Sequence, residues 1–543
     1  MVMVTRINGM VYRFFMRGVK DKANASLSGA PGEMRRSDRQ PVRTLCLGAG
    51  GLIAATFGAT ASAEAWVIIP RITMTESYTY NASLLPAAAA QADWVTEASP
   101  GVHIEHSGPK ANIYLDYGLH RFFYTNQTQL NSTQNVLNSH AKIEAIDNWL
   151  FLDAQANVSQ QNRSAFGTSS ALDAFGVSSN RVETSTYQVA PYIRGQMSDI
   201  ATYQLRFNGT QTRTNDLAFP DTKTSEWVGQ IKSASSSAKL HWSIDGNSLT
   251  IRNGVVGKLE DSRIRGSLIY AIDSQLRISF IGGREITDYA TPTKTTTATY
   301  GLGLEWSPTP RTRIAAVQEK RFFGDGYVLF FGHRTPLTAW RLSSSKDVTV
   351  LPNQLAATQR GSIYDLISDL LTSSIPDPLA RGSAVERRLQ DSGIPANAAL
   401  GSGFLTARPF LNRNHEASLA LLGATNTVTL SFSQREQQVL GPVTRGADSF
   451  SLSNNIRQRS FNFNWSHKLS ALSSLALIAT SLRSEALDIA NLESRQYSVN
   501  IFMSTQIGPK TVASFGARHV KFESSTNAGY QENALLGSLA VRF

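Results

Sequence analysis

The 543-residue sequence predicts an all-β fold, a transmembrane antiparallel β-barrel of about 18–22 strands with a short helical insertion. Three observations lead to this prediction. Apolar and polar residues alternate with period two along most of the chain after residue 66, as on strands with one apolar and one polar face. Tight connections alternate with long polar ones, and the last strand ends on an aromatic residue.

Composition excludes several other classes. The 25 Phe, 16 Tyr and 8 Trp residues exclude a disordered chain, and one cysteine excludes a disulfide scaffold. The net charge is +11, but the first 63 residues hold nine basic and three acidic groups, and the rest holds 43 and 38. Such a mild excess gives no concentrated basic stripe for duplex binding, so no nucleic-acid partner is expected.

The N-terminal segment resembles an export signal. Four arginines (35, 36, 39 and 43) precede an apolar run over residues 44–60, and Ala61-Ser62-Ala63 has the small-residue pattern of a cleavage site. The run is shorter than the about 20 apolar residues of a membrane-spanning helix. We therefore expect an N-terminal extension plus Sec signal peptide over 1–63, with the signal proper at about 34–63. An N-terminal anchor is the alternative.

From residue 64 to 543 we expect one barrel domain. Over residues 201–210, for example, Ala201, Tyr203, Leu205 and Phe207 share one face. A soluble sandwich would alternate in the same way, but the export signal and the loop asymmetry favour a barrel in the outer membrane, in contact with its lipid. Tight connections at 147–149, 197–200 and 508–510 alternate with long ones at 125–138, 160–181 and 437–447.

The last strand carries a predicted insertion signal. Leu539, Val541 and the terminal Phe543 lie on one face, and chains that end this way look like substrates of the outer-membrane barrel-assembly machinery. Aromatic residues near strand ends suit interfacial girdles; these are Tyr80, Trp94, Tyr124, Trp149, Trp242 and Trp306.

Residues 352–411 break the strand pattern. Ile363, Leu366, Ile367, Leu370 and Leu371 follow the spacing of a short amphipathic helix. The segment leaves from an outward-running strand, so we expect a cap over the barrel or a plug within it. A gate is one hypothesis, and a surface decoration is the alternative.

Several motifs resemble one known family. The start at 66–70, the stretch 303–312 with Trp306 and Pro308, the run Arg321-Phe322-Phe323-Gly324, the turn with Arg334, and the tail 530–543 are similar to the PEP-CTERM (exosortase) system-associated outer-membrane protein family. The resemblance covers residue 64 to the end. It implies a Gram-negative outer-membrane barrel encoded beside exopolysaccharide synthesis and exosortase genes, with no catalytic residues to carry over. The motif residues have an architectural interpretation, as turn and strand-end residues.

No catalytic, cofactor or metal motif is present. The sequence has no GxSxG, HExxH or P-loop pattern, and His103 and His106 fall on opposite faces of a strand. We therefore predict no enzyme and no cofactor. A hydrolase that assembles Ser and His across strands would escape such a search.

The leading functional hypothesis is a passive conduit for exopolysaccharide export or cell-surface assembly, working with export-system proteins. Four polar-face arginines, Arg194, Arg206, Arg277 and Arg313, would favour anionic chains in the lumen. The alternative is a structural barrel that anchors surface or periplasmic partners, and a generic porin is the third possibility.

Overall fold

The computed structural model describes residues 66–168, 178, 180–216, 219–235, 239–351, 403–441 and 448–543, with short pieces at 353–355, 367–368, 371, 375, 381–382 and 384–385. The predicted N-terminal extension, signal peptide and cleavage residues Ala61 and Ala63 lie outside these residues. Among the described residues no helix is long and apolar enough to span a membrane.

The described residues contain twenty-two strands. Their bounds are β1 (Val67–Thr79), β2 (Asp93–Ser107), β3 (Ala111–Tyr124), β4 (Ser132–Ile146), β5 (Leu150–Asn162), β6 (Arg181–Met197), β7 (Ala201–Thr214), β8 (Thr222–Ser233), β9 (Leu240–Asn253), β10 (Gly257–Ala271), β11 (Leu276–Thr287), β12 (Thr295–Thr309), β13 (Thr312–Arg321), β14 (Gly324–Arg334), β15 (Thr338–Thr349), β16 (Phe410–Leu422), β17 (Asn426–Val439), β18 (Asn455–Lys468), β19 (Ser473–Ala486), β20 (Glu493–Gly508), β21 (Thr511–Ser524) and β22 (Tyr530–Arg542). Three short 3-10 turns, η1 (Ala87–Ala89), η2 (Thr128–Leu130) and η3 (Ser449–Ser451), lie in connections.

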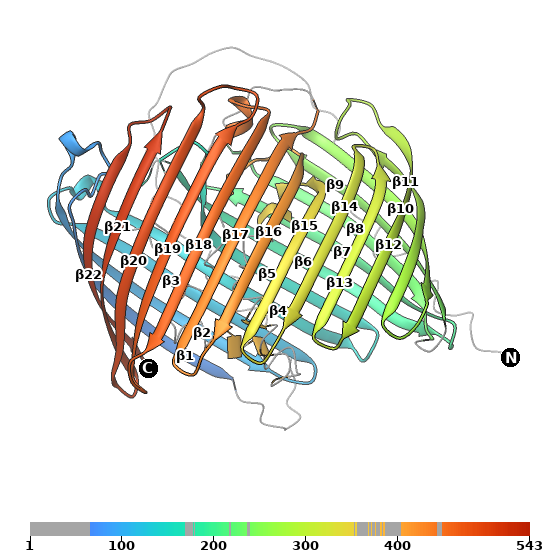
Figure 1. The fold of residues 1–543 in the computed structure, drawn as a ribbon, viewed down its shortest axis with the longest axis horizontal. Helices are drawn as coiled ribbons and strands as arrows, with labels where there is room; N and C mark the ends of the chain where they lie inside the picture. The colour runs from blue at the N-terminus through green and yellow to red at the C-terminus, as the bar shows by residue number, and fades with distance from the viewer. Residues whose placement is uncertain are drawn as a thin grey trace, which may run out of the picture. The chain divides into compact units, whose positions relative to one another are not determined.

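The strands close into one barrel. Each pairs antiparallel with the next along the chain, and β22 pairs with β1, from Arg71 opposite Arg542 to Thr79 opposite Ala534. Figure 1 shows the strands side by side and tilted, so that they form a continuous wall. The closed antiparallel barrel confirms the predicted fold class, and 22 strands lie at the upper end of the predicted range. Closure leaves no free sheet edge, which a bilayer would not tolerate.

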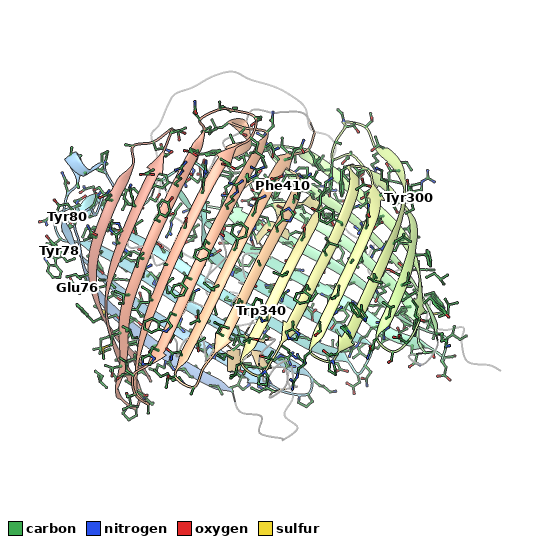
Figure 2. The ribbon with its side chains drawn as sticks, viewed as in Figure 1. Glu76, Tyr78, Tyr80, Tyr300, Trp340 and Phe410 are labelled. Atoms are coloured by element: carbon green, nitrogen blue, oxygen red, sulfur yellow. The ribbon has the colours of Figure 1, made fainter. Side chains whose placement is uncertain are left out.

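The two faces of the wall differ in chemistry. On β12, Tyr300, Leu302 and Trp306 point outward with 64%, 59% and 42% of their surface exposed. Tyr78 on β1 also points away from the barrel (Figure 2). The opposite face turns Ser, Thr, Asn, Gln and charged side chains into the lumen. An apolar outer face and a polar lumen are what a barrel surrounded by lipid requires.

The two ends of the barrel differ as well. At one end, which we call the turn end, β1 begins and β22 finishes, and the hairpins close in short turns such as 147–149, 310–311 and 509–510. The other end, the loop end, carries the longer connections 80–92, 163–180, 350–409 and 440–454. In outer-membrane barrels short turns face the periplasm and long loops face outward.

Three sequence expectations need correction. Tyr124 is not a girdle residue, because it is 3% exposed and packs inside against Val95 and Phe122. The loop expected over 125–138 ends at Asn131, since β4 begins at Ser132. The insertion expected over 352–411 is shorter, because residues 410 and 411 already belong to β16. Most of that insertion lies outside the described residues, so its helical character stays a prediction.

Candidate functional site at the mouth of the barrel

A segment before β16 crosses the loop end of the barrel. Phe404 forms an isolated parallel bridge with Asn162 at the end of β5, and the Leu405 amide donates to the Asn162 carbonyl at 2.8 Å. Farther along, Asn253 Nδ2 at the end of β9 donates to the Ala407 carbonyl at 3.1 Å. In the strand order β5 and β16 lie half the circumference apart. Residues 403–409 therefore span the mouth rather than follow its rim.

Apolar side chains from five segments meet under this crossing, in what we call the mouth cluster. Phe166, Phe404, Phe410, Phe450 and Ile456 are each at most 1% exposed. Phe450 packs edge-on against Phe404, with 5.2 Å between the ring centroids, and its ring is tilted against that of Phe410, with 5.8 Å between the centroids. Each buried phenylalanine contributes roughly 1.5–3 kcal/mol. The cluster thus gives the loops a dry core inside a polar lumen.

A buried polar group sits beside the mouth cluster. The Thr406 hydroxyl donates to Asp448 Oδ2 at 2.6 Å, and Arg408 Nη2 lies 3.4 Å from Asp448 Oδ1. Arg408 also donates to Ser451 Oγ at 3.3 Å. All three central residues are buried, with Thr406 at 0%, Arg408 at 2% and Asp448 at 7% exposure. Because a buried charge needs a partner, Asp448 fixes the position of the crossing segment.

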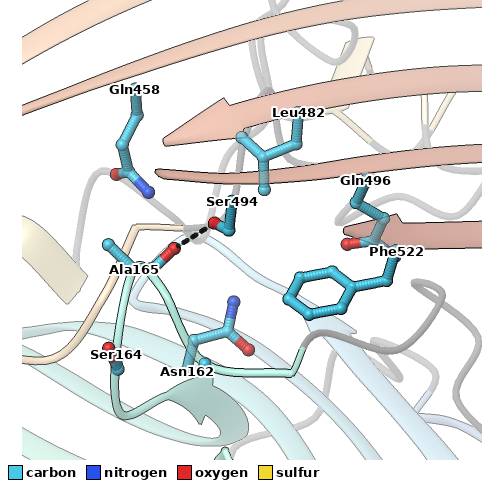
Figure 3. A pocket seen from close by; sticks show the side chains of 9 residues that line it. Asn162, Ser164, Ala165, Gln458, Leu482, Ser494, Gln496 and Phe522 are labelled. Carbon is cyan, nitrogen blue, oxygen red and sulfur yellow. Dashed lines mark hydrogen bonds between the residues drawn. The ribbon is translucent and has the colours of Figure 1, made fainter. Parts of the chain in front are cut away.

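The connection after β5 joins the same closure from the other side. The Ala165 amide donates to Ser449 Oγ at 2.8 Å, and the Ala165 carbonyl accepts from Ser494 Oγ of β20 at 2.9 Å (Figure 3). The Phe166 carbonyl accepts from Ser524 Oγ and Asn527 Nδ2. A small pocket remains between residues 162–167 and the lumen faces of β18–β21 (Figure 3).

Two further apolar clusters border the crossing. One joins Val182, Phe219, Leu351, Leu355 and Leu405, and the other joins Ile251, Tyr289 and Val350 with partly buried neighbours that include Phe322. Burial, followed by the nearby Asp261 and Asp288 carboxylates, raises the pKa of the Tyr289 phenol. The side chains of these two clusters are therefore packed as an interior, not solvated as in surface loops.

The lumen wall is covered unevenly. On β4 the lumen-facing residues Val136, Asn138, His140 and Lys142 are all exposed. On β18, across the barrel, the lumen-facing Gln458, Ser460, Asn462, Asn464 and Ser466 are all buried. The lumen face is therefore more accessible along β4 than along β18.

The four arginines predicted on the polar face all turn into the lumen, near the turn end. Three have carboxylate partners: Arg206 lies 2.5 Å from Asp153, and Arg277 and Arg313 share Glu305 at 3.9 and 3.0 Å. Arg194 instead stacks on the Phe151 ring at 4.2 Å, with no ion pair among the described residues. Two carboxylates thus offset half of the positive charge of the four arginines.

The motif residues fall at opposite ends of the barrel. Trp306, Pro308 and Arg334 lie at the turn end, where Arg334 Nη2 donates to the Pro310 carbonyl at 3.3 Å. Arg321 and Phe322 lie at the loop end, where Arg321 bonds to Glu285 and Asp347. Gly324, with φ of +95°, completes the two-residue turn there.

The predicted insertion-signal residues lie at the closing seam. Leu539 faces Met74 and Val541 faces Ile72, both on the outer face, and the Phe543 amide donates to the Pro70 carbonyl at 2.9 Å. Their role in assembly stays a prediction.

One trio of lumen residues resembles a catalytic set. His120 Nδ1 lies 3.0 Å from Ser99 Oγ and 2.7 Å from Glu97 Oε1. A serine relay needs the acid and the serine on different ring nitrogens, so this geometry is that of a structural hydrogen-bond network. In the described part of the chain no group of three His, Cys, Asp or Glu side chains is placed to hold a metal ion.

Sequence reasoning did not single out the mouth residues Phe166, Phe404, Thr406, Arg408, Phe410, Asp448 and Phe450. A signal was available, because phenylalanines recur in connections otherwise rich in Ser, Gly and Asn. A solvated loop has no reason to hold several large apolar side chains.

No protein-family model matches the chain, and no curated protein matches it. Among solved structures, the FrpB iron transporter of Neisseria meningitidis aligns over 88% of this chain and 82% of its own, at 8% identity and a TM-score of 0.47. The siderophore receptor PirA of Acinetobacter baumannii aligns over 88% of this chain and 80% of its own, at 8% identity and a TM-score of 0.45. OccK5 (OpdH) of Pseudomonas aeruginosa aligns over 88% of this chain and 98% of its own, at 10% identity and a TM-score of 0.30. Since these TM-scores lie below 0.5, the assignment rests on strand register and on the two faces of the wall: the chain is an outer-membrane β-barrel.

Proposed function

We propose that this barrel is a gated passive conduit for long polar chains, with exopolysaccharide as the cargo that the family resemblance implies. The observation that carries the proposal is the contrast between the lumen and its mouth. Along β4 the lumen presents exposed polar side chains, whereas residues 403–409 and the mouth cluster cross the loop end. A polar path closed by a segment that is not part of the strand wall suits a channel that opens on demand.

The second candidate is a structural barrel that anchors partners without transport. The burial of Phe404, Phe410 and Phe450 favours it, because a mouth with a dry core is costly to open. In this case the closure is permanent, and the loop end serves as a binding surface.

Conductance separates the two candidates. Residues 64–543 are refolded into planar bilayers, alone and with a long-chain anionic polysaccharide. A double variant, Phe404→Ala with Phe450→Ala, removes two rings from the mouth cluster. The matched control, Phe432→Ala with Phe461→Ala, removes two outward-facing rings from β17 and β18.

For the conduit, the mouth variant conducts more than the control, and polysaccharide blocks that current. If the wild type and both double variants show no conductance, the result favours the anchoring function. Current that polysaccharide never blocks favours a generic pore.

A further inference from the structure

We propose that the outer face of β8–β10, at the loop end, binds a phosphate group of an outer-leaflet lipid headgroup. Three cations stand side by side there, and we call them the basic row. Lys223 on β8 is directly opposite Arg252 on β9, and Arg252 is directly opposite Lys258 on β10. All three are exposed.

The basic row is electrostatically unfavourable by itself. Directly opposite side chains have Cβ atoms about 5 Å apart, and like charges in this arrangement destabilise a sheet. Lys258 shares Glu260 with Lys294. Lys223 and Arg252 have no carboxylate within ion-pair distance in the part of the chain that the structure describes.

Nearby carboxylates do not cancel the charge. Asp221 pairs with Arg213 at 3.8 Å, and Asp288 Oδ1 accepts from the Glu260 amide at 2.8 Å. Counting Arg213 and Lys294 with the basic row, five cations face the three carboxylates of Asp221, Glu260 and Asp288. An added anion is therefore favoured between Lys223 and Arg252.

The depth of the basic row selects a lipid headgroup as that anion. Trp227 lies four residues from Lys223 on the same outward face and is 53% exposed, and Ile264 below Lys258 is 58% exposed. Four residues along a strand span roughly 13 Å, and because the strand is tilted, the height difference between Lys223 and Trp227 along the membrane normal is smaller than this. The cations thus stand directly above the lipid-facing apolar surface, where headgroup phosphates lie.

The same level of the wall looks different on the other side of the barrel. On β16–β19, Arg413 and Arg457 both pair with Glu436, and Arg457 also pairs with Glu485. There the outward arginines are satisfied by carboxylates on neighbouring strands. A second row of directly opposite outward cations stands on β18–β20, formed by Arg459, Arg483 and Arg495, but each of these arginines pairs with Glu485 or Glu493. The feature that distinguishes β8–β10 is therefore the lack of a carboxylate partner for Lys223 and Arg252, not the row itself.

The test compares two double variants of the full chain, purified in detergent. Lys223→Gln with Arg252→Gln removes the two cations that lack carboxylates. The matched control, Lys521→Gln with Arg413→Gln, removes one lysine and one arginine that pair with Glu523 and Glu436. Native mass spectrometry measures binding of bisphosphorylated lipid A and of lipid A stripped of both phosphates, and heat-modifiable gel mobility confirms that each barrel is folded.

We expect the wild type to prefer the phosphorylated lipid, and the Lys223→Gln, Arg252→Gln variant to bind it roughly 30-fold more weakly. The control retains wild-type affinity, and added salt weakens the wild type toward the variant. Equal affinity of the two double variants overturns the proposal, as does equal binding of the stripped lipid. Competition by inorganic phosphate or by an anionic polysaccharide also overturns it, because the site would then serve a free anion or a passing chain.

Discussion

At the scale of single residues, Asp448 holds the crossing segment through two buried partners. It accepts from Thr406 and balances Arg408, and all three side chains are buried. Residues 403–409 are not part of the wall, so the interactions made by this carboxylate are among the few that hold them across the lumen.

Asp448→Ala should release the crossing segment. Removing one partner of a buried ion pair costs about 3–5 kcal/mol, because the remaining charge stays buried without its counterion. Chymotrypsin is then expected to cut after Phe404 or Leu405 faster than in the wild type, as fragment masses would show. The control, Asp325→Ala, removes an exposed pair with Lys320. Cleavage of Asp448→Ala at the wild-type rate would contradict this role.

Single-residue predictions succeeded where the strand pattern was clean. Arg194, Arg206, Arg277 and Arg313 turn into the lumen as expected, because alternation fixes the face of a residue. Their partners were not predictable, since Glu305 lies on a neighbouring strand whose register no local pattern sets. Tyr124 was misplaced for a related reason: an aromatic ring at a strand end suits the interface and a loop-end core equally well.

At the scale of elements, the alternation of apolar and polar residues predicts where the strands are, but it does not predict their first and last residues. β4 begins with Ser-Thr-Gln-Asn, polar on both faces, because its outward residues near the loop end lie beyond the apolar surface. The alternation of apolar and polar residues disappears there, so the sequence predicts a loop where the strand already begins. The hairpin between β13 and β14 differs from the expectation in the opposite way. Its connection is a two-residue turn of phenylalanines, although it lies at the end of the barrel where long polar loops are expected.

Gly324 makes that two-residue turn possible. Its φ of +95° is a conformation that residues with a Cβ avoid, at a cost of about 1–2 kcal/mol. Gly324→Ala should lower the free energy of unfolding by that amount, measured by urea titration of tryptophan fluorescence in micelles. Gly282→Ala is the control, because that glycine has no positive φ and no atom within 4 Å of an added Cβ. Equal stability of the two variants would show that the turn tolerates a side chain.

At the scale of the whole molecule, the lumen face is more accessible along β4 than along β18. Sequence analysis predicted a lumen from the number of strands, and the closed wall confirms the barrel. It could not predict which part of the wall stays open, because that depends on connections that fold inward. The residues of β4 and β18 are equally polar, yet Asn138 is exposed and Asn462 is 7% exposed.

Single cysteines can map this asymmetry, since Cys46 is the one cysteine of the sequence. In a Cys46→Ser background, Asn138→Cys should react with a membrane-impermeant maleimide roughly tenfold faster than Asn462→Cys in detergent, because burial excludes the reagent and disfavours the thiolate. Equal rates would mean that the lumen is filled or open on both sides. On intact cells the reagent must pass the mouth, so Asp448→Ala should speed the labelling of Asn138→Cys from outside. If that variant exposes Phe404 to protease yet leaves the labelling unchanged, the closure lies deeper than residues 403–409, and the mouth is not the gate.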